Sequence, residues 1–191
     1  MSHNERADLA HITLAPYIVK ATALMSHSRK VGGNQFRHAM ATLAILIDYN
    51  KIDPILLKAA VIHDLIEDIP ETDVDELRRI DADGPAVVDL VLEVTREKGQ
   101  TREQYLQRIV EHGSRSAKVL KVADRISNLV DLNLDIFKPD YIASRLEETS
   151  RFIVPIAAEV SSDMEHEVRD LIRKRHRLLD GPAALRRTGS A

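Results

Sequence analysis

The spacing of apolar residues constrains the fold most, because it is helical in every long segment of the chain. In the segment 35–49, apolar side chains stand three or four residues apart, at Phe36, Met40, Leu43 and Ile47. Such residues share one face of an α-helix, whereas a half-buried strand needs strict alternation of apolar and polar residues. That alternation is not found convincingly in any segment. Helical spacing recurs in the segments 9–27, 54–69, 101–112, 114–134 and 162–178.

The composition agrees with an all-helical domain. Of the 191 residues, 30% are charged and only 4% are aromatic, with seven glycines and seven prolines, which favours helices over an all-β fold. A chain of this length forms one domain, or two small ones at most. We therefore predict an all-α, single-domain helical bundle of about eight to ten helices over residues 1–180. Gly181 and Pro182 end the helical pattern, so residues 181–191 are predicted to form a disordered tail.

Charge and cysteine content exclude several classes of function. The formal net charge is −3 and the isoelectric point is near 6.2, so the chain has no general attraction to nucleic acid or anionic membranes. It has no cysteine, hence no disulfide and no thiolate nucleophile or ligand. It shows neither a signal-peptide pattern nor an apolar run that could span a bilayer. We predict a soluble cytoplasmic protein without nucleic-acid or membrane partners; the sequence leaves open whether it is a monomer or a homodimer.

The segment 59–68 combines small apolar residues with four side chains that bind metal or move protons: His63, Asp64, Glu67 and Asp68. On one continuous helix these four fall within an arc of roughly 140°. Three carboxylates beside a buried face repel one another and lose hydration, which is costly unless a cation or a proton compensates. The alternative is a solvated acidic helix end in which His63 is an ordinary core histidine.

Two further segments carry the same chemistry. His38 lies near the start of one predicted helix and Asp124 lies on another, some sixty residues beyond His63. Together with His63 and Asp64 they offer two imidazoles and two carboxylates, enough to hold one divalent cation and leave positions for water or substrate. This mixed ligation suits manganese, iron or zinc without choosing among them.

Glu67 and Asp68 follow His63 and Asp64 by one helical turn. A bound cation lowers the pKa of its water, and the two carboxylates can orient that water or pass a proton to the leaving group. Basic residues that suit a phosphorylated substrate are found nearby in the sequence; they are Arg29, Lys30, Lys121 and Arg125. Taken singly, the first two also fit a plain surface loop and the last two a solvated charged stripe.

The order of these residues resembles the HD superfamily of metal-dependent phosphohydrolases. It is most similar to one branch, the hydrolase domain of the RelA/SpoT alarmone enzymes and the small alarmone hydrolases of the metazoan SpoT type, over about residues 7–179. A His-Asp pair alone is a weak signal. The specific signal is His63-Asp64-x-x-Glu67-Asp68 followed by Lys121-x-Ala123-Asp124-Arg125-x-x-Asn128. Further matching motifs are Arg29-Lys30-x-Gly32 before His38, Val94-Thr95, Glu148-Thr149 and Pro155-Ile156-Ala157.

The resemblance implies an all-α HD-type hydrolase that uses one Mn²⁺ per chain to remove the 3′-pyrophosphate from guanosine tetra- or pentaphosphate, leaving GDP or GTP. The metal ligands that it implies are His38, His63, Asp64 and Asp124, with Glu67 and Asp68 serving the attacking water. The substrate-binding residues that it implies are Arg29, Lys30 and Asn128, with Lys121 and Arg125 near phosphate or supporting the helix.

The chain departs from the family pattern beside the presumed nucleotide contacts. Gln35 stands where tyrosine is usual, and Val130 where many members have arginine. Neither is a metal ligand, so they leave the identity of the nucleotide open more than the chemistry. The alternatives are a phosphatase acting on another nucleotide (the 2′-phosphate of NADPH or a nucleoside monophosphate) and a non-catalytic nucleotide-binding module. The intact Glu67-Asp68 pair favours an enzyme.

Overall fold

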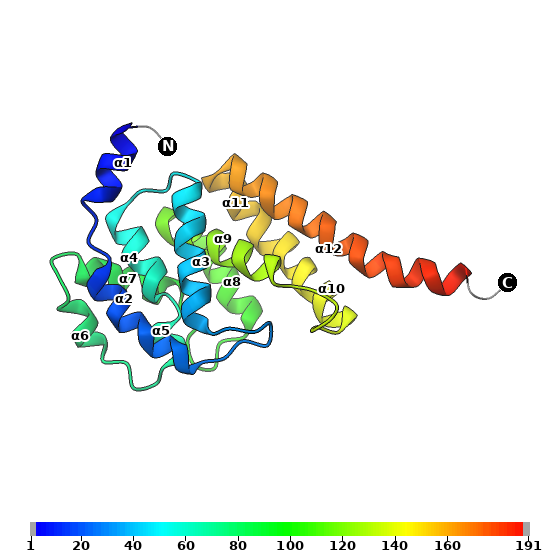
Figure 1. Cartoon of the computed structure of the whole chain (residues 1–191), viewed down its shortest axis with the longest axis horizontal. Helices are drawn as coiled ribbons and strands as arrows, with labels where there is room; N and C mark the ends of the chain where they lie inside the picture. Colours follow the sequence, from blue (N-terminus) through cyan, green and yellow to red (C-terminus); the bar gives the residue numbers. More distant parts are fainter. Residues whose placement is uncertain (1–2, 189–191) are drawn as a thin grey trace.

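The computed structural model describes the backbone of residues 3–188 and the side chains of residues 7–181. Over that range the chain is helical, without a strand, and the expected all-α class is confirmed (Figure 1). The α-helices are α1 His3–Ala10, α2 Ala15–Ala21, α3 Gln35–Asp48, α4 Pro54–Ile62, α5 Leu65–Asp68, α6 Val74–Arg78, α7 Gly84–Val94, α8 Arg102–His112, α9 Arg115–Val130, α10 Pro139–Glu148, α11 Val154–Val160 and α12 Ser162–Thr188. Ten of these have seven residues or more, within the number expected.

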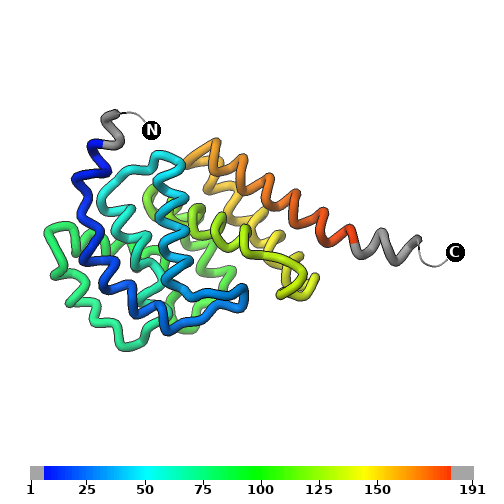
Figure 2. Tube along the Cα trace, in the orientation of Figure 1, coloured from blue at the N-terminus to red at the C-terminus, as the bar shows by residue number. Residues whose placement is uncertain are grey.

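Helix α9 is the centre of the bundle. Eleven of its sixteen residues are buried, including the charged Asp124 and Arg125. Helices α3, α7, α11 and α12 all pack against it, and the trace shows these segments close together around it (Figure 2). A helix buried on several sides cannot keep its polar residues in water. They must therefore find partners inside the protein, and this places charged groups in the middle of the fold.

The segment 54–69 is not the single helix expected from the sequence. Helix α4 ends at Ile62, His63 and Asp64 form a turn, and a short helix α5 follows. The Nδ1 atom of His63 bonds to the Ala60 carbonyl at 2.8 Å. That carbonyl is the acceptor which the Asp64 N–H would use in a continuous helix. The ring thus competes with the backbone bond, and the helix breaks at the two residues that carry the site.

Two other segments differ from a simple helical reading. The segment 9–27 is split into α2 and a 3₁₀ turn at Thr22–Ser26. Helices α10 and α11 are separated by a π-helical turn, Thr149–Ile153, just before Pro155. A proline at 155 has no N–H to bond to the residue 151 carbonyl, so the α-helical ladder cannot run through it. Helix α12 continues to Thr188, so its backbone passes the Gly181–Pro182 boundary expected from the sequence.

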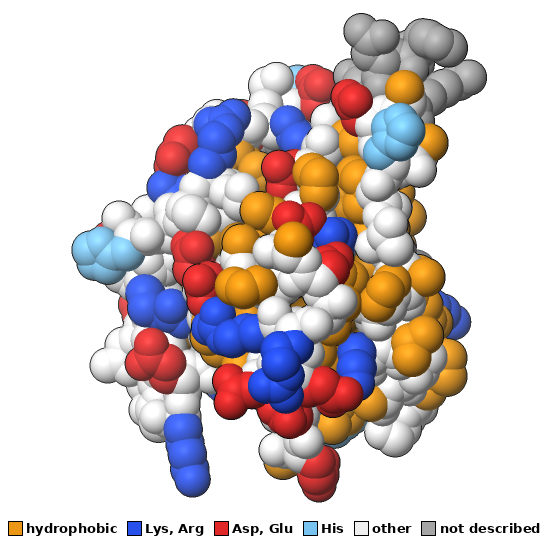
Figure 3. Space-filling model, turned by 90° about the vertical axis from the view of Figure 1, so that its left-hand side faces the viewer, with side chains coloured by type: hydrophobic (Ala, Val, Ile, Leu, Met, Phe, Trp, Pro, Cys, Tyr) orange, Lys and Arg blue, Asp and Glu red, His pale blue; other side chains and the backbone are white. Residues whose placement is uncertain are grey.

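The face formed by α2 and α6 carries acidic and basic side chains interspersed rather than in patches of one sign (Figure 3). Ion pairs link them, such as Lys20 with Glu76 and Arg78 with Asp89. Within the described residues, no helix has both the length and the apolar character needed to cross a lipid bilayer.

Candidate functional site

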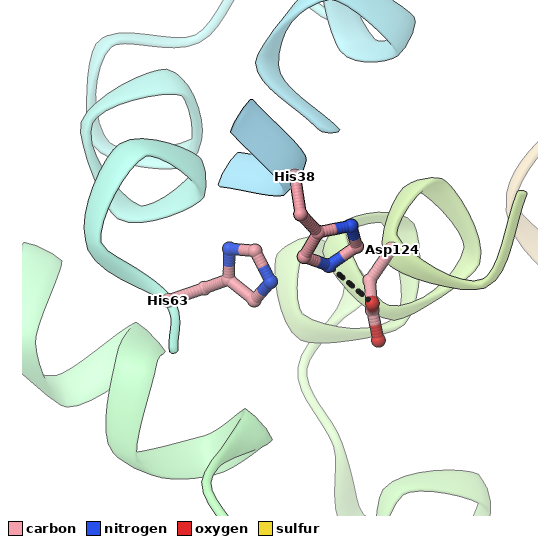
Figure 4. Close-up of side chains that lie close together, drawn as sticks. All are labelled: His38, His63 and Asp124. Carbon is pink, nitrogen blue, oxygen red and sulfur yellow. Dashed lines mark hydrogen bonds and ion pairs between the residues drawn. The ribbon is translucent and has the colours of Figure 1, made fainter. Parts of the chain in front are cut away.

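The two predicted histidines and Asp124 converge in the interior (Figure 4). His38 comes from α3, His63 from the turn after α4 and Asp124 from α9, and one ligand atom of each lies within 4.8 Å of the others. The His38 Nε2 atom is 3.1 Å from Asp124 Oδ1. Asp64 joins them, with Oδ1 3.3 Å from His63 Nε2 and Oδ2 3.6 Å from His38 Nε2. All four side chains predicted as ligands therefore meet at one place.

The histidine rings are oriented by hydrogen bonds on their far sides. His63 Nδ1 donates to the Ala60 carbonyl at 2.8 Å, and His38 Nδ1 is 2.9 Å from Ser127 Oγ. Both Nε2 atoms therefore face the cluster. The Nε2 atom of His63 is buried and makes no well-aligned hydrogen bond within the described residues, although Asp64 Oδ1 lies 3.3 Å from it. A ring whose Nδ1 is held by an acceptor and whose Nε2 faces carboxylates is the arrangement of a metal-ligating histidine, so the donor set fits a divalent cation.

The electrostatics of the cluster show how its charge is balanced by protein groups alone. Burial lowers the pKa of His63, but the carboxylates of Asp64 and Asp124 outweigh it and raise that pKa to about 9. Burial raises the pKa of Asp124, but Lys121 and His38 reverse the effect and hold it well below its usual range. The pKa of Asp64 is lowered in the same way by His63. A divalent cation would take over the charge of the His63 proton, because a ligating histidine must be neutral.

Lys121, Asp124 and Asn128 lie on one face of α9, three and four residues apart. Lys121 Nζ is 2.7 Å from Asp124 Oδ2, and Asn128 Nδ2 donates to Asp124 Oδ1. Lys121 thus holds a predicted ligand in place. Arg125 follows Lys121 by one helical turn and also lines the pocket; it is 3% exposed and donates to Thr149 Oγ1 and Glu148 Oε1.

Glu67 and Asp68 lie on α5 at the wall of the same pocket. The Glu67 side chain is 38% exposed, 3.7 Å from Arg96 Nη2. The Asp68 carboxylate accepts a 2.8 Å hydrogen bond from Gln35 Nε2. The two predicted proton-handling groups therefore differ in environment: Glu67 is open to water and Asp68 is tied to another side chain.

Arg29 also lines the pocket, and three acceptors hold its guanidinium. Its Nη1 donates to Gln35 Oε1 at 2.8 Å, and its Nη2 to Asn128 Oδ1 at 3.0 Å and to Asp131 Oδ2 at 3.2 Å. Lys30, the next residue in the loop before α3, is exposed and is not among the pocket-lining residues. Of the basic loop, the structure brings only Arg29 into this pocket.

The pocket has a volume of about 270 Å³ and includes residues that sequence reasoning missed. Arg102 and Arg145, together with Arg125, surround the Glu148 carboxylate, so this wall carries a net positive charge. Phe137 and Tyr141 stack with ring centroids 5.1 Å apart. Their i, i+4 spacing in an aromatic-poor chain was a usable signal. Arg102 and Arg145 gave none, because only the packing of α8 and α10 brings them to this pocket.

The similarity in sequence to known proteins covers about half of the chain, whereas the similarity in fold covers most of it. No protein-family model matches the chain. The curated relatives carry the name guanosine-3′,5′-bis(diphosphate) 3′-pyrophosphohydrolase MESH1. The protein of Drosophila melanogaster is 35% identical over 85 residues, 42% of this chain and 45% of the relative. The protein of Danio rerio is 32% identical over 111 residues, which are 56% of this chain and 60% of the relative. The protein of Mus musculus is 39% identical over 84 residues, which are 42% of this chain and 45% of the relative.

The chain thus spans about half the length of the curated relatives that it matches. A solved structure, described as a metazoan ortholog of SpoT that hydrolyzes ppGpp and plays a role in starvation responses, matches with a TM-score of 0.67 over 92% of this chain and 97% of that one, at 21% sequence identity. At this identity the match shows the fold alone. The chain is therefore similar to MESH1 proteins over part of its sequence and has the all-helical fold of the metazoan SpoT ortholog, which confirms the resemblance found in its motifs.

Proposed function

We propose that the chain is a Mn²⁺-dependent hydrolase that removes pyrophosphate from the 3′ position of guanosine tetra- or pentaphosphate, leaving GDP or GTP. The observation that carries the proposal is the meeting of two imidazoles and two carboxylates in a pocket that is also lined by Arg29, Arg102 and Arg145. The relatives named for this reaction support the choice of substrate.

In this proposal His38, His63, Asp64 and Asp124 hold the cation. A divalent ion there supplies a Lewis acid for a phosphoryl oxygen and lowers the pKa of water. The orientation of the His63 Nε2 and the depressed pKa of Asp124 both support the assignment, since a ligand must present a lone pair or an ionised oxygen.

Glu67 and Asp68 orient the attacking water and accept its proton as the water oxygen bonds to the phosphorus next to the ribose. The bond from that phosphorus to the 3′ oxygen breaks, and the 3′ oxygen takes up a proton and leaves as the ribose hydroxyl. Glu67 is suited to exchange that proton with solvent because its side chain is partly exposed. Arg29 and Asn128 contact the nucleoside, and Lys121 and Arg125 support the walls. A wall that carries Arg102 and Arg145 complements a second phosphate group. A substrate with two diphosphates fits a pocket that contains both a set of metal ligands and a group of arginines.

The test is to incubate the metal-stripped chain with guanosine tetraphosphate, with and without Mn²⁺, and to measure pyrophosphate and GDP by ion-exchange chromatography. The expected result is stoichiometric release of both products with Mn²⁺ and none with chelator. A matched variant is Glu67→Gln, which keeps the size of the side chain. It should bind Mn²⁺ as the wild type does and lose at least about a hundredfold in turnover, the contribution of a positioned general base.

Two outcomes would replace the proposal. Release of phosphate from NADPH or a nucleoside monophosphate, but no pyrophosphate from guanosine tetraphosphate, would keep the chemistry and change the substrate. Tight nucleotide binding by a protein that takes up no metal would identify a binding module instead. Metal analysis of the purified chain decides the second point, since the enzyme requires about one transition-metal ion per chain.

A further inference from the structure

Gln35 is held at a fixed place between Arg29 and the carboxylates of Asp64 and Asp68. It is the first residue of α3, and its N–H donates to the His27 carbonyl at 2.9 Å. The preceding residue, Asn34, caps the helix by accepting from the Arg37 N–H. Gln35 precedes His38 by three residues, so the two lie on the same face of α3. Its backbone is therefore as firmly set as that of a predicted metal ligand.

Every hydrogen-bonding group of the Gln35 amide is used. The Nε2 atom donates to Asp68 Oδ2 at 2.8 Å and to Asp64 Oδ2 at 3.3 Å. The Oε1 atom accepts from Arg29 Nη1 at 2.8 Å. Turning the amide over would place its oxygen against two carboxylates and its NH₂ against a guanidinium, so these partners allow one orientation only. A carboxylate or an amine at this position could satisfy only one of the two sides.

We propose that Gln35 is a positioning residue that couples the nucleoside-binding arginine, Arg29, to the carboxylate that serves the water, Asp68. The inference rests on the proposed function and deepens it, since it names the side chain that connects substrate recognition to the hydrolytic groups. Within the described residues, Gln35 is the only side chain that hydrogen-bonds the Asp68 carboxylate. Without it, Asp68 is free to rotate away from the water, and Arg29 keeps only its bonds to Asn128 and Asp131.

The coupling also accounts for a departure from the family pattern. A tyrosine hydroxyl at this position has one proton to donate, whereas an amide has two donors and an acceptor on opposite sides. Glutamine can therefore bond the two carboxylates and the guanidinium at once. Position 35 thus adjusts the site through Asp68 and Arg29 without being a catalytic residue.

Two variants separate the two ends of the amide. Gln35→Met keeps the length of the side chain and removes all three hydrogen bonds. Gln35→Glu keeps an acceptor for Arg29 and removes the donors to Asp68 and Asp64. The control is Gln107→Met, because Gln107 is also a glutamine that donates to a carboxylate, Glu111, but it is exposed on α8 and does not line the pocket.

For Gln35→Met we expect kcat to fall and KM for guanosine tetraphosphate to rise, each by about tenfold, the effect of losing a hydrogen bond to a charged group. For Gln35→Glu we expect the same fall in kcat with KM within about threefold of wild type. Mn²⁺ affinity, measured by electron paramagnetic resonance, should weaken at least about tenfold in Gln35→Met, as for other residues that orient metal ligands. The control variant should match wild type in all three measurements.

The coupling is wrong if Gln35→Met keeps wild-type kcat and KM, or if Gln35→Glu raises KM as much as Gln35→Met does. A purely structural role would lower the melting temperature of both variants and leave no difference between them in kcat and KM. The Mn²⁺ titration needs no substrate. If wild type releases no pyrophosphate, the proposed function fails while this titration still decides the role of Gln35: unchanged Mn²⁺ affinity in Gln35→Met would overturn it.

Discussion

Removal of the metal should make the stability of the fold depend on pH through His63. In the metal-free protein, Asp64 and Asp124 raise the pKa of this buried histidine to about 9, against 6.5 for a free side chain. A group whose pKa is higher in the folded state stabilises the fold fully below its unfolded pKa, and the contribution is lost as the pH rises through its folded pKa. Stability of the stripped protein should therefore fall between pH 6.5 and 9.

The size of the effect follows from the two pKa values. At 1.36 kcal/mol for each tenfold change in a protonation equilibrium, the step from 6.5 to about 9 corresponds to roughly 3 kcal/mol in the free energy of unfolding. For a protein of this length that is about 6–12 °C in melting temperature. Saturating Mn²⁺ should abolish the loss, because a ligating imidazole is neutral at every pH in this range.

The assay is urea unfolding at pH 6.5, 7.5 and 9, in chelator and in excess Mn²⁺. His63→Gln should flatten the metal-free profile, whereas the control His112→Gln should leave it unchanged, because His112 has a 76% exposed side chain remote from the pocket. Metal-free stability that stays level or rises from pH 6.5 to 9 would refute the reasoning. It would mean that the two carboxylates do not share the His63 proton.

Three further outcomes are expected. Asp124→Asn should weaken Mn²⁺ binding at least about tenfold in a calorimetric titration, because it removes an ionised ligand; unchanged affinity would exclude this residue from the site. Gly84→Ala should destabilise the fold by about 1–3 kcal/mol in urea unfolding, because a Cβ there would meet the Arg78 carbonyl at 2.4 Å. Gly181→Ala, where a Cβ meets nothing within 4 Å, is its control and should not destabilise. Thr101→Ala should cost about 1 kcal/mol by the same assay, since it removes the capping box of α8; no change would mean that the cap is replaced by solvent.

Much of the fold followed from the sequence because helical structure is local. Apolar spacing along 35–49, 101–112 and 114–134 predicted α3, α8 and α9 and their buried faces. The break at 63–64 did not follow, because it depends on a bond between the His63 ring and a carbonyl one turn back. The spacing of apolar residues predicts which face of a helix is buried, but it does not predict which carbonyl a side chain will hydrogen-bond.

The candidate site divides in the same way. The sequence by itself supplied the ligand types and their order, because His63 is next to Asp64 and the polar residues of α9 lie three and four positions apart. It also predicted the helices α3 and α9, which carry His38 and Asp124. Only the tertiary structure decided that His38, from a different helix, points its Nε2 at Asp124, that Lys30 stays outside the pocket, and that Gln35 connects Arg29 to Asp68. The physical reason is that hydrogen bonds between residues 29 and 128, or 35 and 68, depend on how helices pack, and packing is set by the whole core at once.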